Sequence, residues 1–224
     1  MSFKDIFNID AEVKESAHAR VNLIGEHTDY TGGYVMPTLL SFKNTIEISQ
    51  NNSNEFTVYS QHFKEKKTFN DFKKSINNEW VDYIKGCLHI FFDENKISSR
   101  FLNIFISSDI PLERGISSSS ALCVATLKAL NTFFETKIKD PEIAKLAKKV
   151  EFNYIGVSGG IMDQMVSSIG IHGKAFFMNC KNLEYELINF PENWKFCLID
   201  SEVQRNLRDS SYNERFAELQ EAEK

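Results

Sequence analysis

The chain has 224 residues, of which 42% are hydrophobic and 25% are charged, and its net charge at pH 7 is −5. Such a chain can bury a core, which excludes a disordered protein, and its acidic balance argues against a nucleic acid as the main partner. No apolar run approaches the roughly 20 residues that cross a bilayer, and the N-terminus lacks a signal-peptide pattern, so we expect a cytoplasmic protein without membrane contact.

Short β-prone runs followed by helical periodicity predict an α+β fold. We expect strands at 34–40, 44–49, 55–60 and 101–107, then helices that span Trp80 to Phe91, run from the serines to about Phe134, begin at Pro141 and lie near Met162. Strands should return at 174–179, 183–190 and 195–200, before a final charged, helix-prone stretch. The four scattered cysteines, Cys87, Cys123, Cys180 and Cys197, are expected to be buried as small hydrophobic side chains.

The first candidate site is ARVNLIGEHTDYTGG, residues 19–33. Its polar side chains surround a short apolar core, and its glycines permit sharp turns that would let those side chains converge. A cluster of carboxylates and an imidazole suits a polyhydroxylated ligand, because each hydroxyl needs a donor and an acceptor. The alternative is an ordinary solvated turn.

The second candidate is PLERGISSSSA, residues 111–121, in which four serines open a predicted helix. Unpaired N–H groups and the positive end of the helix dipole attract phosphate oxygens there. Serines are also common N-caps, so the loop alone leaves both interpretations open. Glu113 and Arg114 stand where a phosphate loop normally carries small residues.

The third candidate is VEFNYIGVSGGIMDQMVSSIG, residues 150–170, in which glycines precede Asp163 in the first turn of a predicted helix. Such an aspartate is often merely solvated and favoured by the helix dipole. In a cleft beside a cation it would instead suit a base or an anchor for the transition state.

Taken together, these stretches resemble the galactokinases of the GHMP kinase superfamily. RVNLIGEHTDYTGG at 20–33 and GVSGGIMDQ at 156–164 are similar to two sugar-site segments of that family, and WVDYIKG at 80–86 and SSYNERFAE at 210–218 also resemble it. The resemblance implies a mixed sheet packed with helices, the GHMP kinase N-terminal lobe with a ribosomal protein S5 domain 2-like fold, over residues 1–175. Residues 176–224 would be the opening strands and helix of a truncated second lobe.

The resemblance also implies transfer of the γ-phosphate of ATP to the C1 hydroxyl of galactose, with ATP and Mg²⁺ bound. Asp163 would lie at the reacting hydroxyl, and Arg20 would keep that carboxylate ionised. The other implied roles are sugar binding by Glu26, His27, Asp29, Gly160 and Tyr212, ATP binding by Arg114, Gly115, Ser117, Ser118 and Ser119, and Mg²⁺ binding by Ser119 and Glu151.

Several positions depart from the family pattern. His18 and Ala19 stand where a proline and a glycine are usual, Gly159 replaces a typical cysteine, and no third glycine-rich motif follows residue 170. We therefore expect either a fragment or a shortened homologue, with an exposed apolar face that favours self-association. The open alternatives are a kinase of galacturonate, arabinose or N-acetylgalactosamine, a catalytically silent sugar or ATP sensor, and a fold that has kept no ligand.

Overall fold

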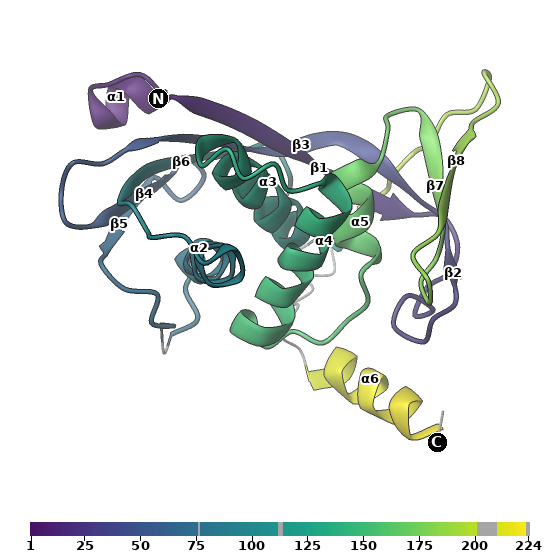
Figure 1. Cartoon of the computed structure of the whole chain (residues 1–224). Helices are drawn as coiled ribbons and strands as arrows, with labels where there is room; N and C mark the ends of the chain where they lie inside the picture. Colours follow the sequence, from purple (N-terminus) through teal and green to yellow (C-terminus); the bar gives the residue numbers. More distant parts are fainter. Residues whose placement is uncertain (76, 112–113, 201–209, 223–224) are drawn as a thin grey trace.

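The computed structural model describes residues 1–75, 77–111, 114–200 and 210–222, without the side chains of 210–213 and 220. Over these residues one mixed sheet is packed with helices (Figure 1). The strands are β1 (Val13–Asn22), β2 (Tyr34–Val35), β3 (Pro37–Gln50), β4 (Phe56–Ser60), β5 (Glu65–Phe69), β6 (Leu102–Ser108), β7 (Lys174–Asn179) and β8 (Tyr185–Asn189). The helices are α1 (Phe3–Phe7), α2 (Val81–Asn95), α3 (Ser118–Phe133), α4 (Asp140–Lys149), the π-helix η1 (Val150–Ile155), α5 (Met162–Ile169) and α6 (Ser210–Ala222).

The sheet is organised around the long strand β3. Its order is β2-β7-β3-β6-β4-β5, with β1 added on β3 and β8 on β7, and β4 with β6 is the parallel pair among otherwise antiparallel neighbours. The register between β1 and β3 shifts between His18 and Arg20. A bulge of this kind re-aims the following side chains, and here it immediately precedes Arg20.

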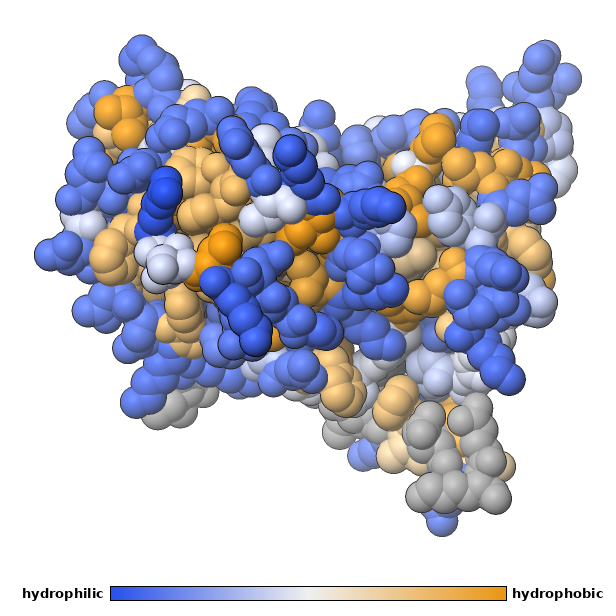
Figure 2. Space-filling model, in the orientation of Figure 1, coloured by the Kyte–Doolittle hydropathy of each residue, from blue (hydrophilic) through white to orange (hydrophobic). Residues whose placement is uncertain are grey.

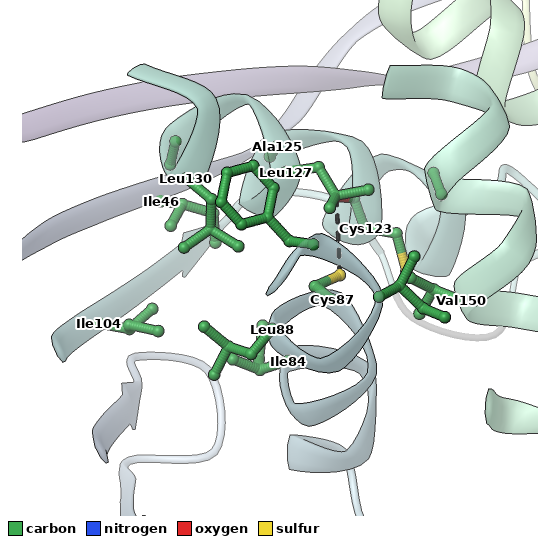
Figure 3. Packing of buried hydrophobic residues seen from close by; sticks show 14 of the residues in the cluster. Ile46, Ile84, Cys87, Leu88, Ile104, Cys123, Ala125, Leu127, Leu130 and Val150 are labelled. Atoms are coloured by element: carbon green, nitrogen blue, oxygen red, sulfur yellow. Dashed lines mark hydrogen bonds between the residues drawn. The ribbon is translucent and has the colours of Figure 1, made fainter. Parts of the chain in front are cut away.

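The main core lies between the sheet and helices α2, α3 and α4, which cover one of its faces (Figure 1). Ile46 of β3, Ile104 of β6, Leu88 of α2 and Leu127 of α3 are all fully buried in this cluster (Figure 3). Inside it, the Cys87 thiol donates a hydrogen bond to the Cys123 carbonyl at 3.8 Å. Each buried aliphatic side chain of this size stabilises the fold by about 1.5–3 kcal/mol, which fixes α3 firmly against the sheet.

The structure confirms the predicted helices and most strands but corrects three expectations. The runs at 34–40 and 44–49 belong mainly to one strand, β3, and no strand forms at 195–200. Cys87 and Cys123 are buried as expected, whereas Cys180 is half-buried and Cys197 is exposed. β7 begins at Lys174 and pairs with β2 and β3, and the division of the chain into two lobes near residue 175 stays a prediction.

Exposed apolar side chains occur beyond β7. Tyr185, Ile188, Trp194, Phe196, Leu198 and Ile199 are each at least 38% exposed. On the face seen in Figure 2, hydrophobic residues are visible near the end of the molecule that carries β7 and β8 and also across its centre. An exposed apolar surface is thus present, and self-association through it stays a prediction.

Candidate active site

A cavity of about 680 Å³ opens where β1, the start of α3, the π-helix η1 and the start of α5 meet. Its volume lies in the range of small-molecule sites. All three candidate stretches contribute to its walls, including the predicted residues Arg20, Glu26, His27, Asp29, Arg114, Gly115, Ser117, Ser118, Ser119, Glu151, Gly160 and Asp163. Segments far apart in the sequence therefore form one site.

At the centre, Arg20 holds Asp163 in a two-pronged ion pair. Arg20 Nε donates to Asp163 Oδ1 at 2.6 Å and Nη2 donates to Oδ2 at 2.7 Å, while Nη1 donates to the Gly115 carbonyl at 3.0 Å. Burial opposes the charge on Arg20, but the charge and hydrogen bonds of Asp163, together with the charges of Glu26 and Asp29, outweigh it and raise the pKa of the guanidinium. A planar guanidinium fixes both the position and the orientation of a carboxylate in this arrangement.

Ser117 ties the start of α3 to the same carboxylate. Its backbone is left-handed, with φ 62° and ψ 44°, and its hydroxyl donates a short hydrogen bond to Asp163 Oδ2. A left-handed conformation is costly for a residue with a side chain, so the surrounding structure must hold it. The sequence predicts that Ser117 faces the triphosphate, and in the structure its hydroxyl instead points to Asp163.

A second buried carboxylate, Glu151, lies in η1 beneath the start of α3. Ser119 Oγ donates to Glu151 Oε1 at 2.7 Å, and Ser120 Oγ donates to Oε2 at 2.7 Å. Gln164 Nε2 also donates to Oε2, at 2.5 Å, and Gln164 Oε1 is buried without a hydrogen-bond partner among the described residues. Burial raises the pKa of Glu151, although these hydrogen bonds act in the opposite direction.

The surroundings of Glu151 fit a hard divalent cation. The carboxylate is paired with hydroxyls and an amide instead of a positive side chain, so its burial is not compensated by charge. Mg²⁺ prefers oxygen ligands and usually takes only one or two carboxylates, completing its shell with water and phosphate oxygens. Within the described ranges no group of three or more His, Cys, Asp or Glu side chains could hold a metal by itself.

Asp29 and Gly160 also line the cavity and lie directly against each other. A Cβ built on Gly160 would collide with the Asp29 carboxylate, so a glycine is required there. Burial, and next the charge of Asp163, raises the pKa of Asp29 to about 6. The half-buried Asp29 carboxylate, beside a glycine that has no side chain, is well suited to accept hydrogen bonds from sugar hydroxyls.

The remaining members of the first stretch are more exposed. Glu26 accepts a hydrogen bond from Asn22 Nδ2 at 3.0 Å, and Asn22 Oδ1 is buried with no partner in the part of the chain that the structure describes. His27, at φ 62°, shares a 2.5 Å hydrogen bond between its Nδ1 and the Tyr30 hydroxyl. Asn22 lines the cavity, but its Oδ1 is shielded from solvent.

Two predicted residues cannot be placed. Glu113 and the side chain of Tyr212 lie outside the described part of the structure. The ring of Phe216 in α6 lies 5.1 Å from that of Tyr30, and Arg215 lines the cavity, so α6 reaches the cavity. Arg114 lines the cavity too, but its Nε pairs with Asp200 at 2.8 Å.

Sequence reasoning assigned no role to several residues of the site, among them Ser120, Lys148, Phe152, Gln164 and Arg215. Ser120 and Gln164 complete the Glu151 network, and Lys148 and Phe152 line the cavity. Ser120, Phe152 and Gln164 lie within stretches already singled out, so their neighbours were a usable signal. Lys148 lies in a helical run of ordinary composition, which gave none. In addition, no described helix is long and apolar enough to span a membrane.

Comparison with known proteins agrees with this architecture. The galactokinase galactose-binding signature matches residues 1–50, and the GHMP kinases N terminal domain matches residues 82–170. The galactokinase of Pyrococcus furiosus is 37% identical over 206 residues, 92% of this chain and 57% of that protein. The galactokinase of Fusobacterium nucleatum is 34% identical over 229 residues, 99% of this chain and 59% of that protein.

Solved structures give the same result. The crystal structure of Lactococcus lactis galactokinase complexed with galactose matches with a TM-score of 0.87 and 31% identity, covering 98% of this chain and 58% of that one. The Methanococcus jannaschii mevalonate kinase matches with a TM-score of 0.66 at 24% identity, which shows the shared fold alone. The expected α+β fold is confirmed, and the chain spans less than 60% of the length of these relatives.

Proposed function

This chain belongs to the GHMP kinase family and is homologous to galactokinases over more than nine-tenths of its length, and from that premise we propose that it phosphorylates galactose at the C1 hydroxyl with ATP. The observation that carries the proposal is the Arg20–Asp163 pair in one cavity with the Asp29 carboxylate and the serine-rich start of α3. A sugar beside Asp29 and a triphosphate at the start of α3 would meet at Asp163.

Asp163 orients the C1 hydroxyl and takes its proton as the reaction proceeds. The hydroxyl oxygen forms a bond to the γ-phosphorus of ATP, the bond from that phosphorus to the β–γ bridging oxygen breaks, and ADP leaves. Two donors from Arg20 and one from Ser117 fix the carboxylate in place. Phosphoryl transfer depends mainly on such positioning and on electrostatic stabilisation.

The sugar hydroxyls are read by Asp29, Glu26 and His27, with Gly160 allowing close approach of the backbone. Polar groups that a bound sugar would cover reject sugars that leave them unpaired. The predicted contact from Tyr212 remains part of the proposal.

The nucleotide lies against the start of α3, where Gly115 and Ser118 line the cavity and free N–H groups of the helix face phosphate oxygens. Mg²⁺ would be held by Ser119 and Glu151, and when bound it would neutralise charge on the phosphates. For Arg114 to bind the nucleotide, its ion pair with Asp200 would have to break.

One assay distinguishes the proposed galactokinase activity from two alternatives. A kinase of galacturonate, arabinose or N-acetylgalactosamine would use the same Asp163 chemistry with another sugar, and a silent sensor would bind without transfer. ADP release should be measured with galactose and with each of these sugars, beside calorimetric binding of galactose and ATP. Binding without turnover would favour the sensor. Faster turnover with another sugar would identify that sugar, and not galactose, as the substrate.

The matched variant for this assay is Asp163→Asn, which keeps the shape and removes the charge. We expect transfer to fall by at least ~10²-fold while galactose binding is retained in part. Near-normal turnover in this variant would contradict the role assigned to Asp163. Light scattering of the same sample measures the self-association expected from the exposed apolar surface.

A further inference from the structure

Four cationic side chains line the cavity, and three of them already have carboxylate partners. Arg20 pairs with Asp163 at 2.6 Å, Arg114 with Asp200 at 2.8 Å, and Arg215 with Glu218 at 2.5 Å. The fourth, Lys148, forms neither a hydrogen bond nor a close ion pair with any residue that the structure describes. Its ammonium is therefore available to a ligand.

Lys148 is held in this position by the fold. It is the penultimate residue of α4, directly before the turns of η1 that carry Glu151, and its side chain is half-buried. Burial lowers the pKa of Lys148, and the Asp29 charge acts in the opposite direction. The other group that acts on it is the Cys180 thiol, whose pKa burial raises to about 12, so the thiol stays neutral.

Asp29 in turn needs a cation. Burial and the charge of Asp163 in α5 both disfavour its charged form, whereas Arg20 in β1 and Lys148 in α4 favour it. Arg20 is already committed to Asp163 through two hydrogen bonds. Lys148 is thus the uncommitted cation that balances Asp29, with Tyr30 and Cys180 as the other titratable groups affected by the Asp29 charge.

We propose that Lys148 is a positioning and specificity residue of the sugar site, which keeps the Asp29 carboxylate charged and donates a hydrogen bond to a ligand hydroxyl beside it. The carboxylate accepts from one hydroxyl and the ammonium donates to its neighbour, so the pair reads two adjacent hydroxyls of a polyol. This inference rests on the proposed binding of galactose in the cavity.

The test compares Lys148→Met and Lys148→Arg with the unchanged chain by galactose calorimetry at pH 8. Lys145→Met is the matched control, because Lys145 lies on the same helix, is exposed and pairs with Glu142 at 2.7 Å. We expect Lys148→Met to weaken binding by ~10- to 100-fold, as for loss of a hydrogen bond to a charged group. Lys148→Arg should recover most of the affinity, and Lys145→Met should match the unchanged chain. Equal affinity in Lys148→Met would overturn the proposal.

A second measurement needs no sugar. The ionisation midpoint of Asp29, followed by its side-chain carboxyl carbon in NMR, should move to higher pH in Lys148→Met and should stay unchanged in Lys145→Met. An unchanged midpoint in Lys148→Met refutes the coupling between the two groups. If the unchanged chain binds no galactose but the midpoint moves, the proposed function fails while the Lys148–Asp29 coupling stands.

Discussion

Replacing Asp29 by asparagine should stabilise the protein at high pH while weakening the proposed sugar site. The folded protein raises the pKa of Asp29 to about 6 from the usual 3.8, with burial as the main cause. Below pH 3.8 the carboxyl is neutral in the folded and unfolded states alike and the shift costs nothing. Between 3.8 and 6 the folded state holds more protons, so the cost of the buried charge grows as pH rises and is complete above pH 6.

The size of the cost follows from the shift. At ~1.4 kcal/mol for each pKa unit, the difference of about two units corresponds to at most ~3 kcal/mol. Asp29 keeps some contact with solvent, which screens its charge, so we expect Asp29→Asn to gain ~1–2 kcal/mol in unfolding free energy at pH 8. Asparagine carries no charge at any pH, so the gain should vanish near pH 3.5.

Urea unfolding of both proteins at pH 8, 6 and 3.5 measures this difference directly. Asp10→Asn serves as the control, because Asp10 is an exposed surface residue paired with Lys4, and that variant should show no comparable gain. A destabilised Asp29→Asn protein at pH 8, or a difference that does not depend on pH, would refute the reasoning. Galactose affinity should fall in the same variant, since activity and stability compete at this position.

Three further predictions concern neighbouring residues. Gly160→Ala should lower galactose affinity and cost ~1–3 kcal/mol of stability, because the new methyl group overlaps Asp29. Calorimetry measures the affinity and urea unfolding the stability. Unchanged affinity would contradict the close contact between Gly160 and Asp29. Glu151→Gln should abolish the stabilisation that Mg²⁺ gives in the presence of ATP. It should not destabilise the free protein, since it removes a buried carboxylate whose pKa is raised. Thermal unfolding with and without Mg²⁺ measures both effects, and a retained Mg²⁺ effect would argue against Glu151 as a ligand. His18→Leu should reduce the loss of stability between pH 7 and 5. Burial and the ring of His172, 4.1 Å away, lower the pKa of His18, so protons bind preferentially to the unfolded chain. An unchanged pH dependence of the unfolding midpoint would contradict this effect of His172 on His18.

The fold was largely predictable because most elements bury one regular face. The sequence prediction splits β3 into two strands because residues 41–43 are exposed and interrupt the hydrophobic pattern. The strand nevertheless continues through them, because exposure does not break backbone pairing. β1 was missed for a similar reason, because VKESAHARVN alternates polar side chains with only small buried ones. The apolar run at 195–200 predicted a strand, but the described backbone makes no sheet pairing there.

The site was predictable where its residues lie in distinctive stretches, and much less so in ordinary helix. Glycine-rich context singled out Asp29 and Asp163, whereas Lys148 lies in an amphipathic helix among other lysines. The hydrogen bond from Ser117 to Asp163 depends on a left-handed backbone, which nothing in a run of four serines indicates. Such contacts are set by tertiary packing, which local sequence does not encode.

The Arg20–Asp163 pair also has a consequence for folding during synthesis. Its two residues are 143 positions apart, so a ribosome adding about 5–20 residues per second delays this contact by roughly 7 to 30 seconds after Arg20 is made. β1 and β3, by contrast, can pair as soon as residue 50 emerges. The active-site ion pair therefore cannot nucleate folding and must form late, after the hydrophobic sheet has already positioned the arginine.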